Sequence, residues 1–398
     1  MPIRAALALA LSIASTAMAQ APDSTWRQHR TAALIASGNG DTVGYRSHML
    51  ALQGLVGVTP RIAAGLAAAS FALFDSAAGR HWSNLVTAME GGSDVEHSVL
   101  AWRFDDADMI PEDLAYDAAH HRTLVSSVRR GSIVAVDARG NSTTFAAGGA
   151  PGTWGIFALG IDARRNTLWA TTAAFPGTAG YTAADSGKSA LLEYDLATGA
   201  LRRRMVPPDG GAHVLGDLAL APDGTVYLSE AIGGTVYVLE RGTSALRTLL
   251  PPGTFSSPQN PALSPDGRRL YVADYTFGIA VIELRSVRWH WLRHPDSLAL
   301  TGIDGMYRVG TDLVVVQNGI SPDRIMRLTL GANDQVLRGT TIVRGGAAVE
   351  LNHAMLRRGQ LYFIARSGWD RLSDDGTMKP AAKGDGPVVR RVSLTTHD

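Results

Sequence analysis

One short phrase of sequence recurs six times in this chain, and it constrains the fold more than any other feature. Each copy is an apolar strand pattern, a polar turn and a second apolar strand, followed by further short strand patterns. The copies start at residues 112, 157, 216, 259, 304 and 352, at intervals of 45, 59, 43, 45 and 48 residues. Repeats of this length with four short strands are typical of β-propeller blades. The sequence therefore predicts a mainly β protein, a six-bladed β-propeller over residues 97–395, with a seventh, degenerate blade as the alternative.

The two ends of the predicted propeller complement each other. The last copy lacks a fourth strand, because residues 388–394 read as its third, whereas residues 98–104 read as a strand that precedes the first blade. Pairing between these segments would close the ring and remove an open sheet edge. The longest interval contains a segment rich in Gly, Ala and Thr at 175–187, which we expect to form a loop over one face.

Composition excludes several classes of function. The chain has no cysteine, which excludes disulfides, zinc ribbons, iron–sulfur clusters and a thiol nucleophile. Its 37 basic and 36 acidic residues give a net charge of +1, so a nucleic-acid partner is not expected. The sequence also lacks the G-x-S-x-G, phosphate-loop and H-E-x-x-H motifs, which leaves serine hydrolase, nucleotide hydrolase and zincin activities without support.

The first residues have the pattern of a cleavable signal peptide. Arg4 precedes the short apolar run 5–14, and Ala17-Met18-Ala19 forms an A-x-A cleavage site. We therefore expect residues 1–19 to be removed and the protein to be periplasmic or secreted. No later segment predicts a membrane span.

Residues 24–92 have apolar residues at helical rather than strand spacing, and they predict a small α-helical region before the propeller. Tyr45, Met49, Leu52 and Val56 fall on one helix face. A similar apolar spacing returns 33 residues later, and a helix pair repeating at this length resembles the tetratricopeptide unit. A generic helical extension is the alternative. The helices are a candidate surface for a protein partner.

Propeller topology indicates where a site lies. The innermost strand of each blade starts at one mouth of the central channel, so the first residue of each phrase should ring that mouth. The six positions are Glu112, Phe157, Gly216, Gln259, Asp304 and Asn352. Carboxylates and amide oxygens are ligands that hard divalent cations prefer. The alternative is a hydrated polar channel that holds no ion.

The phrases PEDLAYD, SPDGRRLYVADY and IDGMYRVGTDLVVV resemble the gluconolactonase, senescence-marker protein and luciferin-regenerating enzyme family. This resemblance implies a six-bladed propeller that hydrolyses a lactone or ester with one divalent cation in its channel. It implies that Glu112 and Asp304 bind the cation and that Asp304 is also the general base.

Two positions depart from the family pattern. Where the family has a ligand Asn opening blade four, this chain has Gln259 followed by Asn260. Side chains alternate along a strand, so Asn260 replaces Gln259 only if a bulge turns it, and Pro258 and Pro261 flank the pair. Both residues remain candidate ligands. Where the family has an Asn opening blade three, this chain has Gly216 and then Asp217. The candidate substrate-binding residues at the mouth are Phe157, Asp217, Asn318, Asn352, His353 and Arg366.

Two functions stay open at this point. The first is a cation-dependent hydrolase of a small-molecule lactone or ester, with calcium as the first expectation and zinc, magnesium or manganese as alternatives. The second is a non-catalytic propeller that binds a small molecule, a glycan or a protein. Fold alone does not choose between them.

Overall fold

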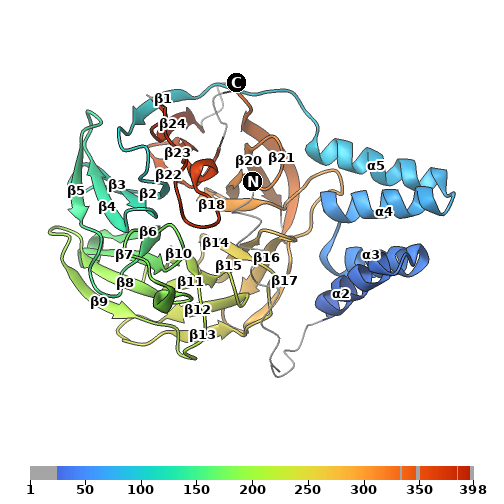
Figure 1. The fold of residues 1–398 in the computed structure, drawn as a ribbon, viewed down its shortest axis with the longest axis horizontal. Helices are drawn as coiled ribbons and strands as arrows, with labels where there is room; N and C mark the ends of the chain where they lie inside the picture. Colours follow the sequence, from blue (N-terminus) through green and yellow to red (C-terminus); the bar gives the residue numbers. More distant parts are fainter. Residues whose placement is uncertain (1–24, 332–333, 347–349, 383, 395–398) are drawn as a thin grey trace.

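The computed structural model describes residues 25–394, except 332–333, 347–349 and 383. The predicted signal peptide lies outside these residues. Six four-stranded antiparallel sheets stand around a central axis, and four helices lie beside the ring (Figure 1). The predicted six-bladed β-propeller with a helical region before it is thus confirmed.

Each blade is a meander in which successive strands pair as neighbours. Blades one to three contain β2 (Pro111–Asp117), β3 (Arg122–Ser127), β4 (Ser132–Val136) and β5 (Ser142–Ala146); β6 (Gly155–Asp162), β7 (Thr167–Ala173), β8 (Ser189–Asp195) and β9 (Leu201–Met205); and β10 (Leu215–Leu220), β11 (Val226–Glu230), β12 (Thr235–Leu239) and β13 (Arg247–Leu250). Blades four to six contain β14 (Pro258–Leu263), β15 (Arg269–Asp274), β16 (Gly278–Glu283) and β17 (Arg288–Trp291); β18 (Ile303–Val309), β19 (Asp312–Gln317), β20 (Arg324–Gly331) and β21 (Gln335–Arg344); and β22 (Ala354–Arg357), β23 (Gln360–Arg366), β24 (Val388–Ser393) and β1 (Val99–Arg103).

Strand β1 closes the ring by completing the last blade. It pairs antiparallel with β24, with Val99 opposite Arg391 and Arg103 opposite Val388. This is the closure predicted for residues 98–104, and β24 is the predicted third strand. Six buried hydrophobic clusters fill the ring, each drawing its residues from two neighbouring blades. The blades are therefore held together by apolar packing, which is the main favourable term in folding.

Four helices form the predicted N-terminal region: α2 (Thr25–Gly38), α3 (Thr42–Val56), α4 (Pro60–Ala72) and α5 (Ser76–Glu90). Three of them begin at side-chain caps, in which Asp41, Thr59 and Asp75 accept from the backbone N–H three residues later. The predicted face of α3 is confirmed in that Met49, Leu52 and Val56 are buried. The tetratricopeptide likeness stays a prediction. No helix of the described residues is both long and apolar enough to cross a membrane.

Helix α2 docks on blade four. The indole of Trp26 meets the ring of Phe277 edge-on, with 4.9 Å between centroids. Next to it, the Arg27 guanidinium donates to the carbonyl oxygens of Gly253 and Phe255 at 3.0 and 2.8 Å. An aromatic contact and two hydrogen bonds thus fix α2 against loops of the propeller.

The last helix ends on two arginines of blade five. The Arg324 side chain, only 4% exposed, donates to the carbonyl oxygen of Met89 at 2.9 Å and to Gln317 Oε1 at 2.8 Å. Arg344 donates to the carbonyl oxygens of Glu90 and Gly91. Cations here satisfy helix-end carbonyls and oppose the negative end of the helix dipole. Burial, with the neighbouring Arg344, lowers the pKa of Arg324 to about 10.

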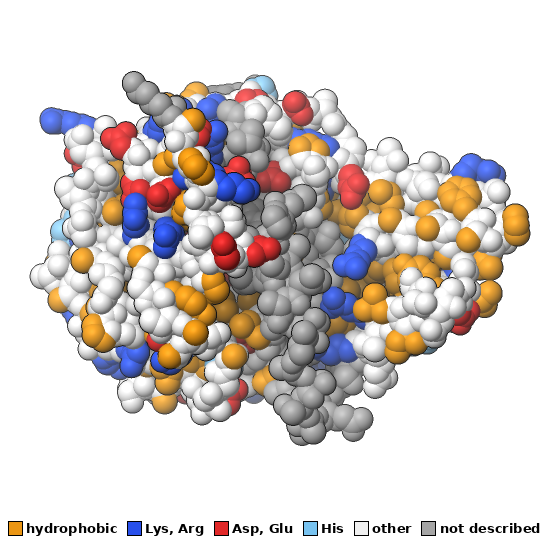
Figure 2. Space-filling view, viewed as in Figure 1, with side chains coloured by type: hydrophobic (Ala, Val, Ile, Leu, Met, Phe, Trp, Pro, Cys, Tyr) orange, Lys and Arg blue, Asp and Glu red, His pale blue; other side chains and the backbone are white. Residues whose placement is uncertain are grey.

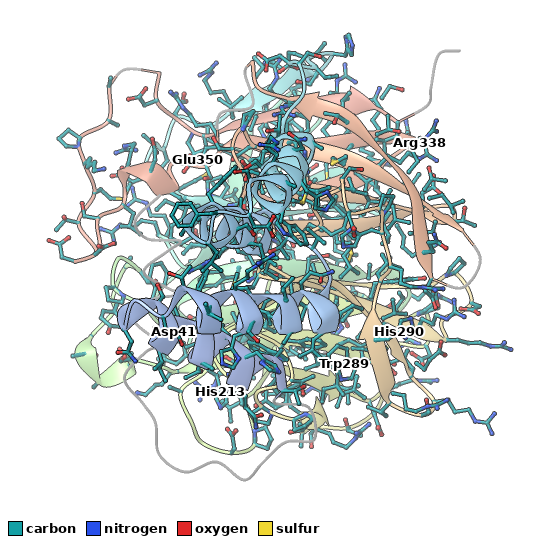
Figure 3. All side chains as sticks on the ribbon, turned by 90° about the vertical axis from the view of Figure 1, so that its right-hand side faces the viewer. Asp41, His213, Trp289, His290, Arg338 and Glu350 are labelled. Carbon is teal, nitrogen blue, oxygen red and sulfur yellow. The ribbon has the colours of Figure 1, made fainter. Side chains whose placement is uncertain are left out.

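We predict that Arg324→Ala lowers the free energy of unfolding by about 3 kcal/mol, because buried carbonyl groups lose their donor. Chemical denaturation followed by circular dichroism measures this change. The matched control is Arg338→Ala, an exposed arginine of β21 in the same blade (Figure 3), which should change stability by less than about 0.5 kcal/mol. Equal effects of the two substitutions would contradict this account of how α5 is anchored.

Candidate functional site

The inner strands are irregular where they begin at the channel mouth. In five of the six blades the pairing between the first two strands shifts register within the first residues of the repeated phrase. A bulge of this kind sets two residues against one on the partner strand and interrupts the alternation of side chains. In blade four the register shifts between Pro258 and Pro261, where the sequence analysis considered a bulge.

Consecutive residues of each phrase therefore form two levels of the channel. The first level contains the six predicted ring positions, which are half-buried apart from the buried Asn352. The second level is buried throughout and contains Asp113, Ala158, Asp217, Asn260, Gly305 and His353. Solvent thus reaches the first level only, and polar groups of the second level must find partners inside the protein.

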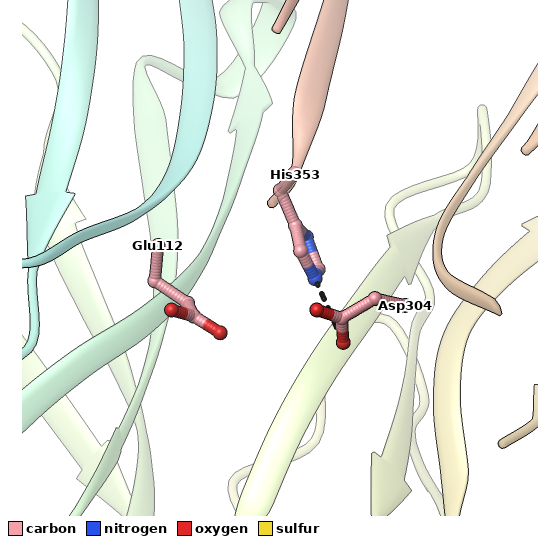
Figure 4. Close-up of side chains that lie close together, drawn as sticks. All are labelled: Glu112, Asp304 and His353. Atoms are coloured by element: carbon pink, nitrogen blue, oxygen red, sulfur yellow. Dashed lines mark ion pairs between the residues drawn. The ribbon is translucent and has the colours of Figure 1, made fainter. Parts of the chain in front are cut away.

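Glu112, Asp304 and His353 converge from three blades (Figure 4). One potential ligand atom of each lies within 4.8 Å of those of the other two. The structure thus brings together the two carboxylates that the sequence predicted. It adds His353, which the sequence placed among the substrate-binding residues.

Glu112 is oriented by two donors from blade six. Its Oε2 atom accepts from Asn352 Nδ2 at 2.7 Å and from the indole Nε1 of Trp369 at 2.5 Å. Trp369 belongs to the short helix η3 (Trp369–Arg371) in the long loop between β23 and β24. Asn352, predicted to contact substrate, therefore lies at the site, where it positions a carboxylate.

Asp304 is oriented through Asn318. The Asn318 amide nitrogen donates to Asp304 Oδ2 at 2.5 Å and to the carbonyl oxygen of Leu351 at 3.0 Å. The amide oxygen of Asn318 accepts from the Tyr275 hydroxyl at 3.0 Å. A chain of three side chains therefore holds the predicted general base, and Asn318 acts on that base rather than at the open mouth.

His353 lies in the second level, 1% exposed, among carboxylates of three other blades. Its Nε2 atom is 3.4 Å from Asp217 Oδ1 and 3.7 Å from Asp304 Oδ1, and its Nδ1 atom is 3.7 Å from Asp113 Oδ1. Blades three and six face each other across the ring, so the contact with Asp217 spans the channel. The imidazole is therefore the one basic side chain that these distances place among the carboxylates.

Burial and charge shift the proton affinities of this pair. Burial raises the pKa of Asp217 to about 8, and the carboxylates of Asp304 and Asp113 add to that rise while His353 opposes it. Burial by itself would lower the pKa of His353, but Asp217 and Tyr307 raise it well above its ordinary value. Both groups therefore retain protons at a pH at which they would lose them in water.

The remaining predicted residues have contacts of their own. The Gln259 amide nitrogen donates to Ser257 Oγ at 3.0 Å, within its own blade. Asn260, oriented so that its amide group is satisfied, donates to the carbonyl oxygen of Met306 at 2.6 Å. The Arg366 guanidinium is 3.4 Å from Asp385 Oδ1, in the β23–β24 loop. The ring of Phe157 lies beside that of Phe175.

Sequence reasoning missed Asp113 and Trp369. A signal for the first existed, since the second position of the phrase is polar in four of six copies, including Asp113 and His353. Asp113 accepts from the backbone N–H groups of Leu114 and Leu159, both at 2.7 Å. Trp369 lies outside the repeated phrase, in the β23–β24 loop, so no spacing indicated it.

The three converging groups fit a divalent cation. Ligands on opposite sides of such an ion, each at about 2.0–2.5 Å from it, are separated by up to about 5 Å. Two carboxylates and an imidazole are ligands found together in metal centres. The channel also has more carboxylates than cations, and buried charges require compensation.

Comparison with known proteins supports the fold alone. The sequence matches no family model, and no curated protein matches it. Among solved structures, a gluconolactonase from Xanthomonas campestris is 15% identical, with a TM-score of 0.51 over 75% of this chain and 97% of that one. A streptogramin B lyase is 11% identical, with a TM-score of 0.51 over 75% and 97%. An aldose sugar dehydrogenase from Streptomyces coelicolor is 15% identical, with a TM-score of 0.50 over 74% and 96%. These three names describe different reactions, so the shared fold does not choose among them.

The raised pKa of Asp217 predicts how stability depends on pH in metal-free protein. The unfolded chain loses this proton near the ordinary pKa of 3.8, whereas the folded chain keeps it up to about 8. Stability should therefore fall as pH rises from 5 to 8, by roughly 2–5 kcal/mol. Denaturation at several pH values with a chelator present measures this fall, and Asp217→Asn should reduce it.

The matched control is Asp223→Asn, on an exposed turn of the same blade. Hydrogen bonds from Thr225 lower the pKa of Asp223, so it is charged in both states across this range. Its effect on stability should not change between pH 5 and 8. An undiminished fall in Asp217→Asn would contradict the assignment.

Proposed function

We propose that this protein hydrolyses a lactone or an ester with the help of one divalent cation held by Glu112, Asp304 and His353. The observation that carries the proposal is the convergence of these three side chains in the channel, Glu112 and Asp304 from the half-buried level and His353 from the buried one. The Xanthomonas campestris gluconolactonase has a similar fold, so the architecture is compatible with lactone hydrolysis. A cation in this position would polarise a substrate carbonyl and make bound water more acidic.

Glu112 and Asp304 have different roles in the proposed reaction. Glu112, oriented by hydrogen bonds from Asn352 and Trp369, presents its carboxylate to the proposed cation site. Asp304 accepts the proton of the attacking water at Oδ1, while its Oδ2 atom stays bound to Asn318. A base that is already oriented needs no rearrangement during the reaction, and this contributes to rate.

The ligand set bears on the choice of ion. Carboxylate oxygens suit the calcium that the sequence analysis puts first, and they equally suit magnesium and manganese. The imidazole nitrogen of His353 adds a ligand that suits zinc. We propose one cation per chain, and metal analysis of the purified protein identifies it.

A second candidate is binding without catalysis, through the helical region. Seven large hydrophobic side chains of that region are exposed, as Figure 2 illustrates on one face: Leu34, Ile35, Val43, Leu50, Leu55, Phe71 and Phe74. Exposed apolar surface of this kind is a feature of protein contact sites. This candidate requires neither a cation nor hydrolysis, so the metal experiment below separates it from the first.

We predict that Glu112→Gln and Asp304→Asn each reduce the bound cation from about one per chain to less than about one tenth, because each removes a charged ligand. Mass spectrometry of metals in gel-filtered protein measures this. Hydrolysis of lactones or esters should fall about 100-fold or more. The matched control is Glu240→Gln, an exposed glutamate of blade three paired with Arg247, which should retain the cation. A wild-type protein without a cation, or variants that keep one, would refute the proposal.

We also propose that the protein is exported, since the A-x-A pattern ends at Ala19. Protein recovered from the periplasm or medium of a bacterial host should begin at Gln20, as measured by intact mass. Exported protein that retains Met1 would count against a cleavable signal peptide.

A further inference from the structure

A row of three aromatic side chains leads away from the proposed cation site. Trp369 begins the row, and its indole N–H donates to Glu112 Oε2 at 2.5 Å. Phe175 follows, with its ring centroid 5.8 Å from that of Trp369, and Phe157 is 6.0 Å farther on. All three are partly buried. The row therefore places an apolar surface beside one of the two carboxylates of the site.

Two long loops hold this row in position. One joins β7 to β8 and carries Phe175, and the other joins β23 to β24 and carries Trp369. They meet at Gly177 and Gly376: a Cβ atom on Gly376 would lie 2.4 Å from the backbone nitrogen of Gly177, and the φ of 103° at Gly177 also favours glycine. The Arg129 side chain donates to the carbonyl oxygen of Gly177 at 2.5 Å. The loop predicted over one face at 175–187 thus has a partner in blade six.

Buried apolar residues pack against the three aromatic rings. Ile110, Val128 and Leu372 form a hydrophobic cluster against which Phe157, Phe175 and Trp369 pack. Ile110 directly precedes β2 and Val128 directly follows β3 in blade one, and Leu372 belongs to the blade-six loop. Aromatic rings fixed on such a base form a ready surface for an apolar group.

The same surface is poorly suited to a sugar. A sugar lactone has hydroxyl groups around its ring, and a site that prefers such a substrate supplies hydrogen-bonding partners for them. The two phenylalanines have no polar atoms. The one polar atom among the three rings is the Trp369 indole nitrogen, and Glu112 already accepts its hydrogen.

We infer that the substrate is a lactone or ester with an alkyl or aryl substituent that packs on Trp369, Phe175 and Phe157 while its carbonyl lies at the cation site. This inference rests on the proposed function for the reaction itself. The aromatic row is the part of the site that would recognise the substituent. Water adds to the carbonyl carbon, the acyl–oxygen bond breaks, and the products are a carboxylate and an alcohol, with one proton released.

The test compares two lactones with the same ring, δ-dodecanolactone and glucono-δ-lactone, on the full-length exported protein loaded with its cation. We expect kcat/KM to be at least about tenfold higher for the alkyl lactone, which buries apolar area on the row. Phe175→Ala, and separately Phe157→Ala, should each lower that ratio about tenfold. The control is Leu337→Ala, which removes an apolar side chain that is 58% exposed on β21 and should leave the ratio unchanged. A ratio near or below one, or a ratio unchanged in both row variants, overturns the inference.

A binding measurement separates this inference from the proposed hydrolysis. Calorimetry with the corresponding cyclic ethers, a heptyl-substituted tetrahydropyran and anhydroglucitol, needs no reaction. Tighter binding of the alkyl ether, weakened about tenfold by Phe175→Ala, supports apolar recognition even if neither lactone is hydrolysed, and in that case the hydrolase proposal alone fails. Equal binding of the two ethers overturns the inference.

Discussion

Closure of the ring by β1 and β24 is the constraint on which the rest of the structure depends. The first strand of the propeller completes the last blade, so the innermost strands of all six blades surround one axis. Residues far apart in the chain then become neighbours. Glu112 and Asn352, separated by 240 residues, are joined by a hydrogen bond of 2.7 Å. The site exists because closure of the ring brings equivalent positions of the six repeats together around the channel.

This convergence has an electrostatic consequence. Glu112, Asp113, Asp217 and Asp304 all approach the axis, where burial makes unpaired charge costly. Backbone and side-chain N–H groups satisfy part of this demand, and the His353 imidazole lies within 3.4–3.7 Å of three of the carboxylates. Raised pKa values of Asp217 and His353 are the sign of the remaining imbalance. A bound cation is the simplest compensation for it, and this links the electrostatics to the proposed chemistry.

The helical region is physically connected to the same site through one turn. Between β15 and β16, Tyr275 reaches inward to Asn318, and Asn318 holds Asp304. Two residues later, Phe277 faces outward and packs on Trp26 of α2. The turn therefore has the helical region on one side and the proposed general base on the other. Helices that look like an addition to the propeller thus support the wall of its channel.

The repeat length, the strand patterns and the unpaired first segment were sufficient to predict the blades, their number and the closure, because strand periodicity and turns are local properties. They also identified Glu112 and Asp304, since equivalent repeat positions meet at the channel mouth. The ligand role open to His353 was not predictable, because His353 holds the second position of its phrase, whereas Glu112 and Asp304 hold the first, and the phrase alone does not show that the two positions meet. Trp369 and Phe175 lie in loops without repeats, and only the packing of those loops at Gly177 brings their rings together. The sequence by itself thus determined which strands surround the channel, whereas the tertiary structure decided which side chains meet inside it, since those contacts join residues hundreds of positions apart.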